Sequence, residues 1–174
     1  MKLRQINIEY NAEQDRLLMR ISSGDNSEVL LWLTRRCTKL LWGVLLQLMR
    51  SVPVIATQSH PEAKTALMGM RHEEALAKTD FSKPYQAAAE PERPLGAEPI
   101  LVARMQTKPN PDGSFVLTLL PLKGQGINLN LDEKLLHSVC GLLRKVAAST
   151  DWGLELDWPQ GAATAPQTEP RTLN

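Results

Sequence analysis

The chain has 174 residues, of which 43% are hydrophobic and 22% charged, as in an ordinary globular protein. This composition excludes a fully disordered chain, a collagen and a disulfide-rich mini-protein. The 20 lysine and arginine residues stand against 19 acidic residues. The net charge of +1 therefore gives no overall basic field that would indicate nucleic acid or a membrane as the partner.

Residues 1–50 predict three strands and a helix. Apolar and polar side chains alternate in three stretches, which is the pattern of half-buried strands, and polar turns separate the stretches. Thr34 is an N-cap residue in front of leucines and valines at helical spacing, and Pro53 follows them. We therefore expect a helix over 37–50 with one apolar stripe facing the strands. The predicted strands cover 5–10, 16–21 and 29–33.

Residues 99–148 repeat this plan, with a helix predicted after Asp132. Most of the two stretches align at a constant offset of 98 residues, so that Leu31 falls on Leu129 and Thr34 falls on Asp132. Chemically matched residues at one fixed register predict an internal repeat. The predicted strands of the second stretch cover 100–106, 115–122 and 127–131.

We expect an α+β fold in which two β-β-β-α repeats with antiparallel sheets pack pseudo-symmetrically as a single domain over 1–158, with a helical connector between them. The expected parts are repeat 1 (3–50), the helical connector and linker (51–98) with a helix from Pro61 to about Lys78, repeat 2 (99–148), a last strand (151–158) and a disordered tail (159–174). The apolar stripes should form one core. Its predicted members are Leu31, Leu33, Leu41, Val44, Leu45, Leu48, Leu117, Leu129, Leu131, Val139, Leu142 and Val146.

The sequence favours a cytoplasmic protein with no membrane contact. The N-terminal residues alternate apolar and polar and lack the continuous apolar run of a secretory signal. The ten residues from Leu40 to Met49 amount to about half of a membrane span. Cys37 and Cys140 are isolated, with no CxxC spacing, so we expect two buried, reduced thiols.

Motifs of the common chemistries are missing from the sequence. The three histidines fall in separate predicted elements. His72 begins a stretch like the zinc motif HExxH, but Leu76 stands where the second histidine belongs, so His72 is expected to be solvated. We name no catalytic residue, metal ligand or cofactor, and we expect a protein that is not an enzyme. A small enzyme whose site is invisible in the sequence is the third alternative.

Charge is distributed unevenly along the chain. Residues 1–50 hold eight basic and five acidic residues, and 101–150 hold six and three, so each stretch is net +3. Residues 51–100 hold five and seven, and 151–174 hold one and four, which gives −2 and −3. Both predicted repeats are therefore basic, whereas the connector and the tail are acidic.

The first repeat carries the candidate binding residues. Arg16 and Arg20 share one strand face by the two-residue period, Trp32 is expected to point away from the core, and two arginines follow it closely. A tryptophan beside guanidinium groups can stack on an unpaired base while the arginines bind phosphates, or it can anchor a protein partner. The candidate residues are Arg16, Arg20, Trp32, Arg35 and Arg36.

These residues predict a non-catalytic binding or adaptor protein. Single-stranded nucleic acid is the first hypothesis for the partner, and a protein partner is the alternative. Two structural alternatives weigh against an exposed surface. The connector helix or the other repeat can cover Trp32, and Arg16 and Arg20 can pair with Glu9 or Glu28 across neighbouring strands.

Three segments resemble a family of uncharacterised proteobacterial proteins: 15–20 (DRLLMR), 32–36 (WLTRR) and 80–82 (DFS). The resemblance covers most of the chain to about Trp158 and implies a bacterial cytoplasmic protein, with no activity attached. The predicted duplicated architecture is also similar to the Whirly and PUR-type folds, which implies binding of single-stranded nucleic acid. Those folds place four strands before each helix, whereas this chain shows three, and their glycine- and aromatic-rich strand signatures are missing.

Overall fold

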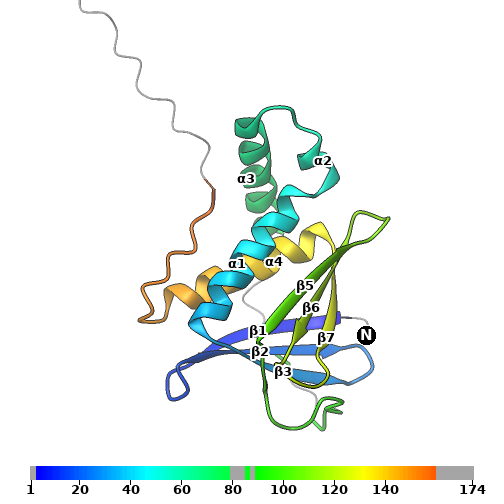
Figure 1. The fold of residues 1–174 in the computed structure, drawn as a ribbon, viewed down its shortest axis with the longest axis vertical. Helices are drawn as coiled ribbons and strands as arrows, with labels where there is room; N and C mark the ends of the chain where they lie inside the picture. Colours follow the sequence, from blue (N-terminus) through cyan, green and yellow to red (C-terminus); the bar gives the residue numbers. More distant parts are fainter. Residues whose placement is uncertain (1–2, 79–84, 87–88, 160–174) are drawn as a thin grey trace, which may run out of the picture.

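The structure is a computed structural model that describes residues 3–78, 85–86 and 89–159. Except for Pro159, the tail predicted over 159–174 lies outside the described residues. The described part is an α+β fold with four helices, a four-stranded sheet in the order β1-β2-β3-β4 and a three-stranded sheet in the order β5-β6-β7 (Figure 1). The elements are β1 (Leu3–Asn11), β2 (Arg16–Ser23), β3 (Glu28–Leu33), α1 (Arg35–Arg50), α2 (Pro53–Ala56), α3 (Pro61–Ala77), β4 (Ile100–Leu101), β5 (Arg104–Pro109), β6 (Phe115–Leu120), β7 (Ile127–Leu131) and α4 (Glu133–Ala148).

The four-stranded sheet is built on the alternating pattern of the N-terminal strands. β2 pairs antiparallel with both β1 and β3, and the register places Met19 opposite Leu31 and Ile21 opposite Val29. Each of these side chains is at most 3% exposed. The apolar half of the alternation therefore forms the inner face of the sheet.

The first unit (β1-β2-β3-α1) and the second unit (β5-β6-β7-α4) have matching elements. β6 pairs antiparallel with β5 and β7, and Leu117 lies opposite Leu129 as Met19 lies opposite Leu31. Both residues of this pair, and both ends of the helix, lie 98 residues further along the chain in the second unit. The predicted offset thus describes the secondary structure as well as the residue types.

The helices of the two units start at a capping side chain. Thr34 Oγ1 accepts the backbone N–H of Cys37 at 3.2 Å, and Asp132 Oδ1 accepts that of Leu135 at 2.7 Å. Such caps satisfy a backbone donor that the first helical turn leaves free. Because Thr34 is the cap, α1 begins at Arg35, two residues before the predicted start.

The strand predicted over 100–106 is wrong, because the chain forms two strands there in two sheets. β4 joins the four-stranded sheet parallel to β3, and β5 begins the three-stranded sheet. Between them, the N–H of Val102 donates to the carbonyl of Trp32 at 3.0 Å, and the N–H of Ala103 donates to that of Leu120 at 2.8 Å. The backbone changes sheets between two neighbouring residues, which a pattern of side chains does not reveal.

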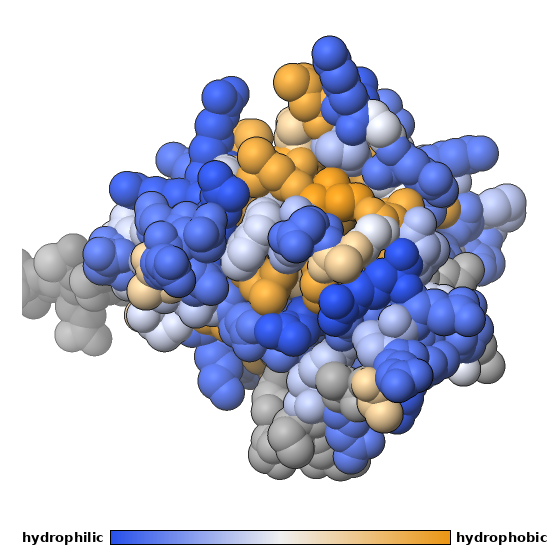
Figure 2. Space-filling model, turned by 90° about the horizontal axis from the view of Figure 1, so that it is seen from below, coloured by the Kyte–Doolittle hydropathy of each residue, from blue (hydrophilic) through white to orange (hydrophobic). Residues whose placement is uncertain are grey.

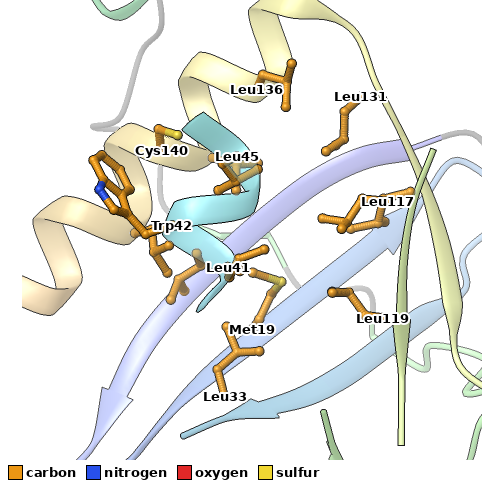
Figure 3. Packing of buried hydrophobic residues seen from close by; sticks show 14 of the residues in the cluster. Met19, Leu33, Leu41, Trp42, Leu45, Leu117, Leu119, Leu131, Leu136 and Cys140 are labelled. Atoms are coloured by element: carbon orange, nitrogen blue, oxygen red, sulfur yellow. The ribbon is translucent and has the colours of Figure 1, made fainter. Parts of the chain in front are cut away.

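One core fills the space between the two sheets and the crossed helices α1 and α4 (Figure 1, Figure 3). α1 contacts β2 and β3, whereas α4 contacts β1 and β7, so the helix of the second unit also covers the four-stranded sheet. Of the twelve predicted core residues, nine are buried, while Val44, Leu142 and Val146 are partly buried against the same cluster.

The connector contains the predicted helix, α3, and a short preceding helix, α2, that was not predicted. Beyond α3, Tyr85 and Arg93 attach the connector to the four-stranded sheet through Glu28, whose side chain is 4% exposed. The Tyr85 hydroxyl donates to Glu28 Oε1 at 2.7 Å, and Arg93 Nη2 donates to Oε2 at 3.0 Å. These bonds satisfy a carboxylate that would be costly to bury alone.

The last strand predicted over 151–158 is also wrong. The segment pairs with no described strand, and Trp152 and Leu156 are instead buried separately, at 5% exposure each. Trp152 donates from Nε1 to Asp15. Gly153 has φ +57°, which takes the chain out of the extended conformation of a strand. The alternation of apolar residues here reflects anchoring to the body of the protein.

Candidate functional site

The outer face of the four-stranded sheet holds three of the five candidate residues. Because alternate residues of a strand point to opposite faces, Arg16 and Arg20 lie on the face opposite Met19, away from the core. The register sets Leu18 opposite Trp32, so Trp32 lies on this outer face as well. The two-residue period thus places Arg16, Arg20 and Trp32 as predicted.

A strip of apolar side chains crosses this outer face. Leu18 pairs with Trp32, and Trp32 pairs with Leu101, so these residues lie side by side on β2, β3 and β4. Leu30 precedes Trp32 by two residues on the same face. Leu101 is 43% exposed, Trp32 is partly buried, and the other two side chains are buried. Figure 2 shows hydrophobic surface at the centre of a view from below, bordered by hydrophilic residues. We call Leu18, Leu30, Trp32 and Leu101 the apolar strip.

The two arginines of this face differ in their partners. Arg20 forms an ion pair with Glu9 of the neighbouring strand β1, which is one of the alternatives weighed from the sequence. Glu28 pairs with Arg93 of the connector. Within the part of the chain that the structure describes, Arg16 has no ion pair. The charge of Arg20 is therefore compensated, whereas Arg16 offers a positive charge at the end of the strip.

Arg35 and Arg36 lie in the first turn of α1 and not on the sheet. Both are exposed, and together with Lys39 they line an open hollow against residues 153–155 of the C-terminal segment. Because β3 leads directly into α1, this turn lies at the end of the sheet where β2 begins with Arg16. The structure thus divides the five candidates between a sheet face and a helix start at one end of that sheet.

A buried histidine pair, which the sequence did not predict, joins α3 to α4. The prediction that His72 is solvated is wrong, because His72 is 5% exposed and its Nδ1 lies 3.2 Å from Nδ1 of His137, which is 1% exposed. Trp158 stacks on His72 with the ring centroids 3.9 Å apart. The available signal was helical spacing: Met68, one turn before His72, is also buried, so the two residues mark one packed face of α3.

The surroundings of the pair favour neutral imidazoles. Burial lowers the pKa of His72 to about 4, and the charges of His137 and Arg144 act in the same direction. Burial also lowers the pKa of His137, with Glu133 opposing this change and Arg71 adding to it. Between two neutral rings, one Nδ1 donates and the other accepts. The contact at 3.2 Å is therefore a hydrogen bond between two neutral side chains.

The cysteines and histidines form no metal centre in the described part of the chain, where no three of the histidine, cysteine and acidic residues are placed to hold a metal ion. Cys37 and Cys140 are free and buried, as expected. Burial raises the pKa of Cys37 to about 11 and raises that of Cys140 too. Both thiols are protonated at neutral pH, so neither is an activated nucleophile.

Comparison with known proteins identifies no relative of the chain: no family model, no curated protein and no solved structure matches it. None of the described helices is both long and apolar enough to cross a membrane. The resemblance to a proteobacterial family stays a prediction. The function must therefore be inferred from the geometry of the outer face of the four-stranded sheet, the basic first turn of α1 and the histidine pair.

Proposed function

We propose that this chain is a cytoplasmic, non-catalytic binding protein that holds a polypeptide partner on the outer face of its four-stranded sheet. The observation that carries the proposal is the apolar strip, in which Trp32 lies between Leu18 and Leu101 on the face opposite the helices (Figure 1). Protein interfaces have an apolar centre and a polar rim, and tryptophan and arginine supply much of their binding energy.

The charges around the strip indicate the chemistry of the partner. Arg16, at one end of the strip, and the exposed Arg35 and Arg36 have no ion pair with any described residue. Their charges complement an acidic segment, and such complementarity raises the association rate and selects partners. The partner therefore inserts an apolar or aromatic side chain beside Trp32 and carries acidic residues next to it.

Single-stranded nucleic acid is the second candidate partner. The partly exposed Trp32 close to unpaired arginines favours it, because an indole can stack on a base while guanidinium groups bind phosphates. Two features favour the polypeptide. The exposed residue beside Trp32 is Leu101, an aliphatic side chain that offers no ring to stack on a base, and Glu9 compensates the charge of Arg20.

Substitution of one exposed leucine tests the polypeptide proposal. Leu101→Glu places a charge in the strip, and since Leu101 is 43% exposed the fold should persist. Leu122→Glu is the matched control, because Leu122 is 73% exposed and lies outside the strip. Each full-length variant is used to capture proteins from a nuclease-treated lysate of the host. We expect about tenfold less of the partner with Leu101→Glu only, which corresponds to roughly 1.4 kcal/mol. Equal capture by all three proteins would contradict the proposal.

Titration of a labelled single-stranded oligonucleotide separates the second candidate from the first. Phosphate binding weakens steeply with salt, whereas an apolar anchor does not. If the ligand is nucleic acid, binding at low salt is lost in the double variant Arg35→Ala/Arg36→Ala. An affinity no tighter than about 100 μM at low salt, the weak end of non-specific binding, excludes nucleic acid.

We further infer that the two units are copies of one internal repeat that pack pseudo-symmetrically. Support comes from the 98-residue offset shared by the helix bounds and by the pairings of β2 with β3 and of β6 with β7. Superposition of the Cα atoms of the two units tests this inference. A single fit over strands and helix would support a repeat, and helices that leave their strands at different angles would contradict it.

A further inference from the structure

A hollow lies between α3 and α4, on the helix side of the molecule and away from the outer face of the four-stranded sheet (Figure 1). The facing ridges of the two helices form its walls, with side chains three and four residues apart on each. Its volume is about 210 Å³, which is enough for a small ligand. The lining residues are Arg71, Glu74, Ala75 and Lys78 of α3, and Glu133, Lys134 and His137 of α4.

His137, one of the residues that line this hollow, has an unsatisfied and buried ring nitrogen. Its side chain is 1% exposed, Nδ1 is held by His72, and Nε2 has no hydrogen-bond partner among the described residues. The nearest acidic atom, Glu133 Oε1, lies 3.9 Å from Nε2, beyond hydrogen-bond distance. The negative charge of Glu133 favours the tautomer with a proton on Nε2, so His72 donates to Nδ1 and Nε2–H is left as a free donor. A buried donor without an acceptor costs roughly 1–3 kcal/mol, which a ligand atom can recover.

The charges of the hollow leave a positive excess. Arg71 binds both carboxylate oxygens of Glu133, with 2.8 Å between Nη2 and Oε2, and Lys78 binds Glu74. Each acidic group of the hollow thus already has a cation. Lys134, also in the wall, has no ion pair within the described ranges. It lies in the first turn of α4, where the helix dipole adds partial positive charge.

We propose that this hollow binds an oxyanion, the carboxylate or phosphate group of a small molecule, through the Nε2–H of His137 and the ammonium of Lys134. Two donors on neighbouring turns of one helix face can bind two oxygens of the same group, and the aliphatic stems around them accommodate a short apolar body. The site is separate from the apolar strip and does not depend on the polypeptide partner. An anion next to Nε2 also stabilises the protonated imidazole, so binding should raise the pKa of His137.

Two probe anions, inorganic phosphate and acetate, test the site on the full chain at constant ionic strength. The ring signals of His137 are followed by NMR up to about 50 mM anion, which covers the millimolar Kd expected of so small a ligand. We expect a saturable shift of these signals and a rise in the pKa of His137 with at least one anion. Saturation by phosphate alone identifies a phosphate group as the ligand, and saturation by acetate alone identifies a carboxylate.

Two variants separate the site from general surface charge. Lys134→Gln keeps an exposed polar side chain and should weaken binding by about fivefold or more, since it removes one charge-assisted hydrogen bond. Lys145→Gln, at an exposed lysine in the last turn of the same helix, should leave the affinity unchanged. The proposal is overturned if neither anion gives a saturable shift of the His137 signals, or if both variants weaken binding equally.

Discussion

The outer faces of the two units differ, although their strands share one register. Leu30 and Trp32 of β3 correspond, at the 98-residue offset, to Asn128 and Asn130 of β7. In the second unit these two residues accept hydrogen bonds from other polar side chains. Thr118 Oγ1 donates to Asn128 Oδ1 at 2.7 Å, and the amide of Asn110 donates to Asn130 Oδ1. The outer face of the second sheet is therefore polar along β7, although Val116 of β6, which corresponds to Leu18, is apolar. The first unit differs in the apolar residues of β3, Leu30 and Trp32, which strand pairing does not require.

The first residues of the helices also differ between the two units. Arg35 and Arg36 open α1, whereas Glu133 and Lys134 occupy the equivalent positions in α4. An acidic residue stabilises the positive N-terminal end of a helix, and basic residues there are unfavourable. α1 thus carries exposed charges that weaken it slightly, near the partly buried Trp32 and the exposed Leu101. Both differences agree with the proposal that the first unit binds the partner.

Unlike the outer faces and the helix starts, the core should be alike in the two units. Substitutions at equivalent core residues test this expectation, and they have the largest expected effect on stability. Leu45 in α1 and Leu143 in α4 lie 98 residues apart, and neither is exposed. We expect Leu45→Ala and Leu143→Ala each to lower the free energy of unfolding by about 2–5 kcal/mol. Urea unfolding followed by circular dichroism measures both.

The control for these variants is Leu40→Ala, at a leucine of α1 that is 56% exposed. It should change the free energy of unfolding by less than about 0.5 kcal/mol. If Leu143→Ala has an effect as small as the control while Leu45→Ala is costly, the two helices do not make equivalent contributions to one core, and the comparison of the units fails.

Two glycines, one in each unit, give a second and smaller contrast. A Cβ on Gly126 would overlap the carbonyl oxygen of Leu119 and lie 2.9 Å from Cα of Leu120, whereas a Cβ on Gly43 would meet nothing within 4 Å. Gly126→Ala should therefore cost about 2–3 kcal/mol, as overpacking does. Gly43→Ala, inside the exposed face of α1, should add about 0.5–1 kcal/mol of stability. Thermal unfolding of both variants checks the opposite signs, and a loss of stability in Gly43→Ala would show that this helix face is covered.

Local patterns predicted most of this fold because they depend on neighbouring residues. Alternation placed β2 and β3, the cap Asp132 placed the start of α4, and the start of α1 after Thr34 was predicted to within two residues. The pairing partner of a strand depends on residues far away in the chain, and there the sequence failed. The backbone at Val102 and Ala103 changes sheets, and the alternating segment 151–158 finds no strand to pair with.

The same distinction holds for the candidate site. The shared face of Arg16, Arg20 and Trp32 follows from the two-residue period alone. The addition of Leu101 to the strip required the parallel pairing of β4 with β3. The contact of the two histidines required the relative placement of two helices 65 residues apart, which no local pattern contains.

The third contrast concerns pH, because His137 occupies the position in α4 that the exposed Lys39 occupies in α1. The pKa of His72 is about 4 in the folded protein and about 6.5 in an unfolded chain, and the pKa of His137 is lowered too. Between these values the unfolded chain binds more protons. Stability is therefore complete above about pH 6.5 and falls as the pH is lowered toward 4, by at most about 1.4 kcal/mol per pH unit and histidine.

Urea unfolding at several pH values between about 4.5 and 7 measures how the free energy of unfolding changes over this range. In His72→Gln one titrating ring is gone, so the free energy of unfolding should depend less steeply on pH than in the wild type. His60→Gln, at an exposed histidine, serves as the control for a change of total charge. An identical slope in His72→Gln and the wild type would show that carboxylates, and not the histidine pair, cause the acid sensitivity.

The smallest expected effect on stability is also the sharpest test of why the two units differ. Arg35→Glu gives α1 the first residue that α4 has, at an exposed position just after the cap. The negative charge interacts favourably with the helix dipole, so the free energy of unfolding should rise by about 0.3–1 kcal/mol. The same variant removes a positive charge that we assign to the acidic partner, so capture of that partner should fall, and more so at low salt because exposed charges are screened at high salt. A gain in stability together with a loss of binding is expected of a residue retained for function at the expense of the fold. If Arg35→Glu is neutral for binding at all salt concentrations, the basic start of α1 has no part in the interface, and the apolar strip alone would distinguish the first unit from the second.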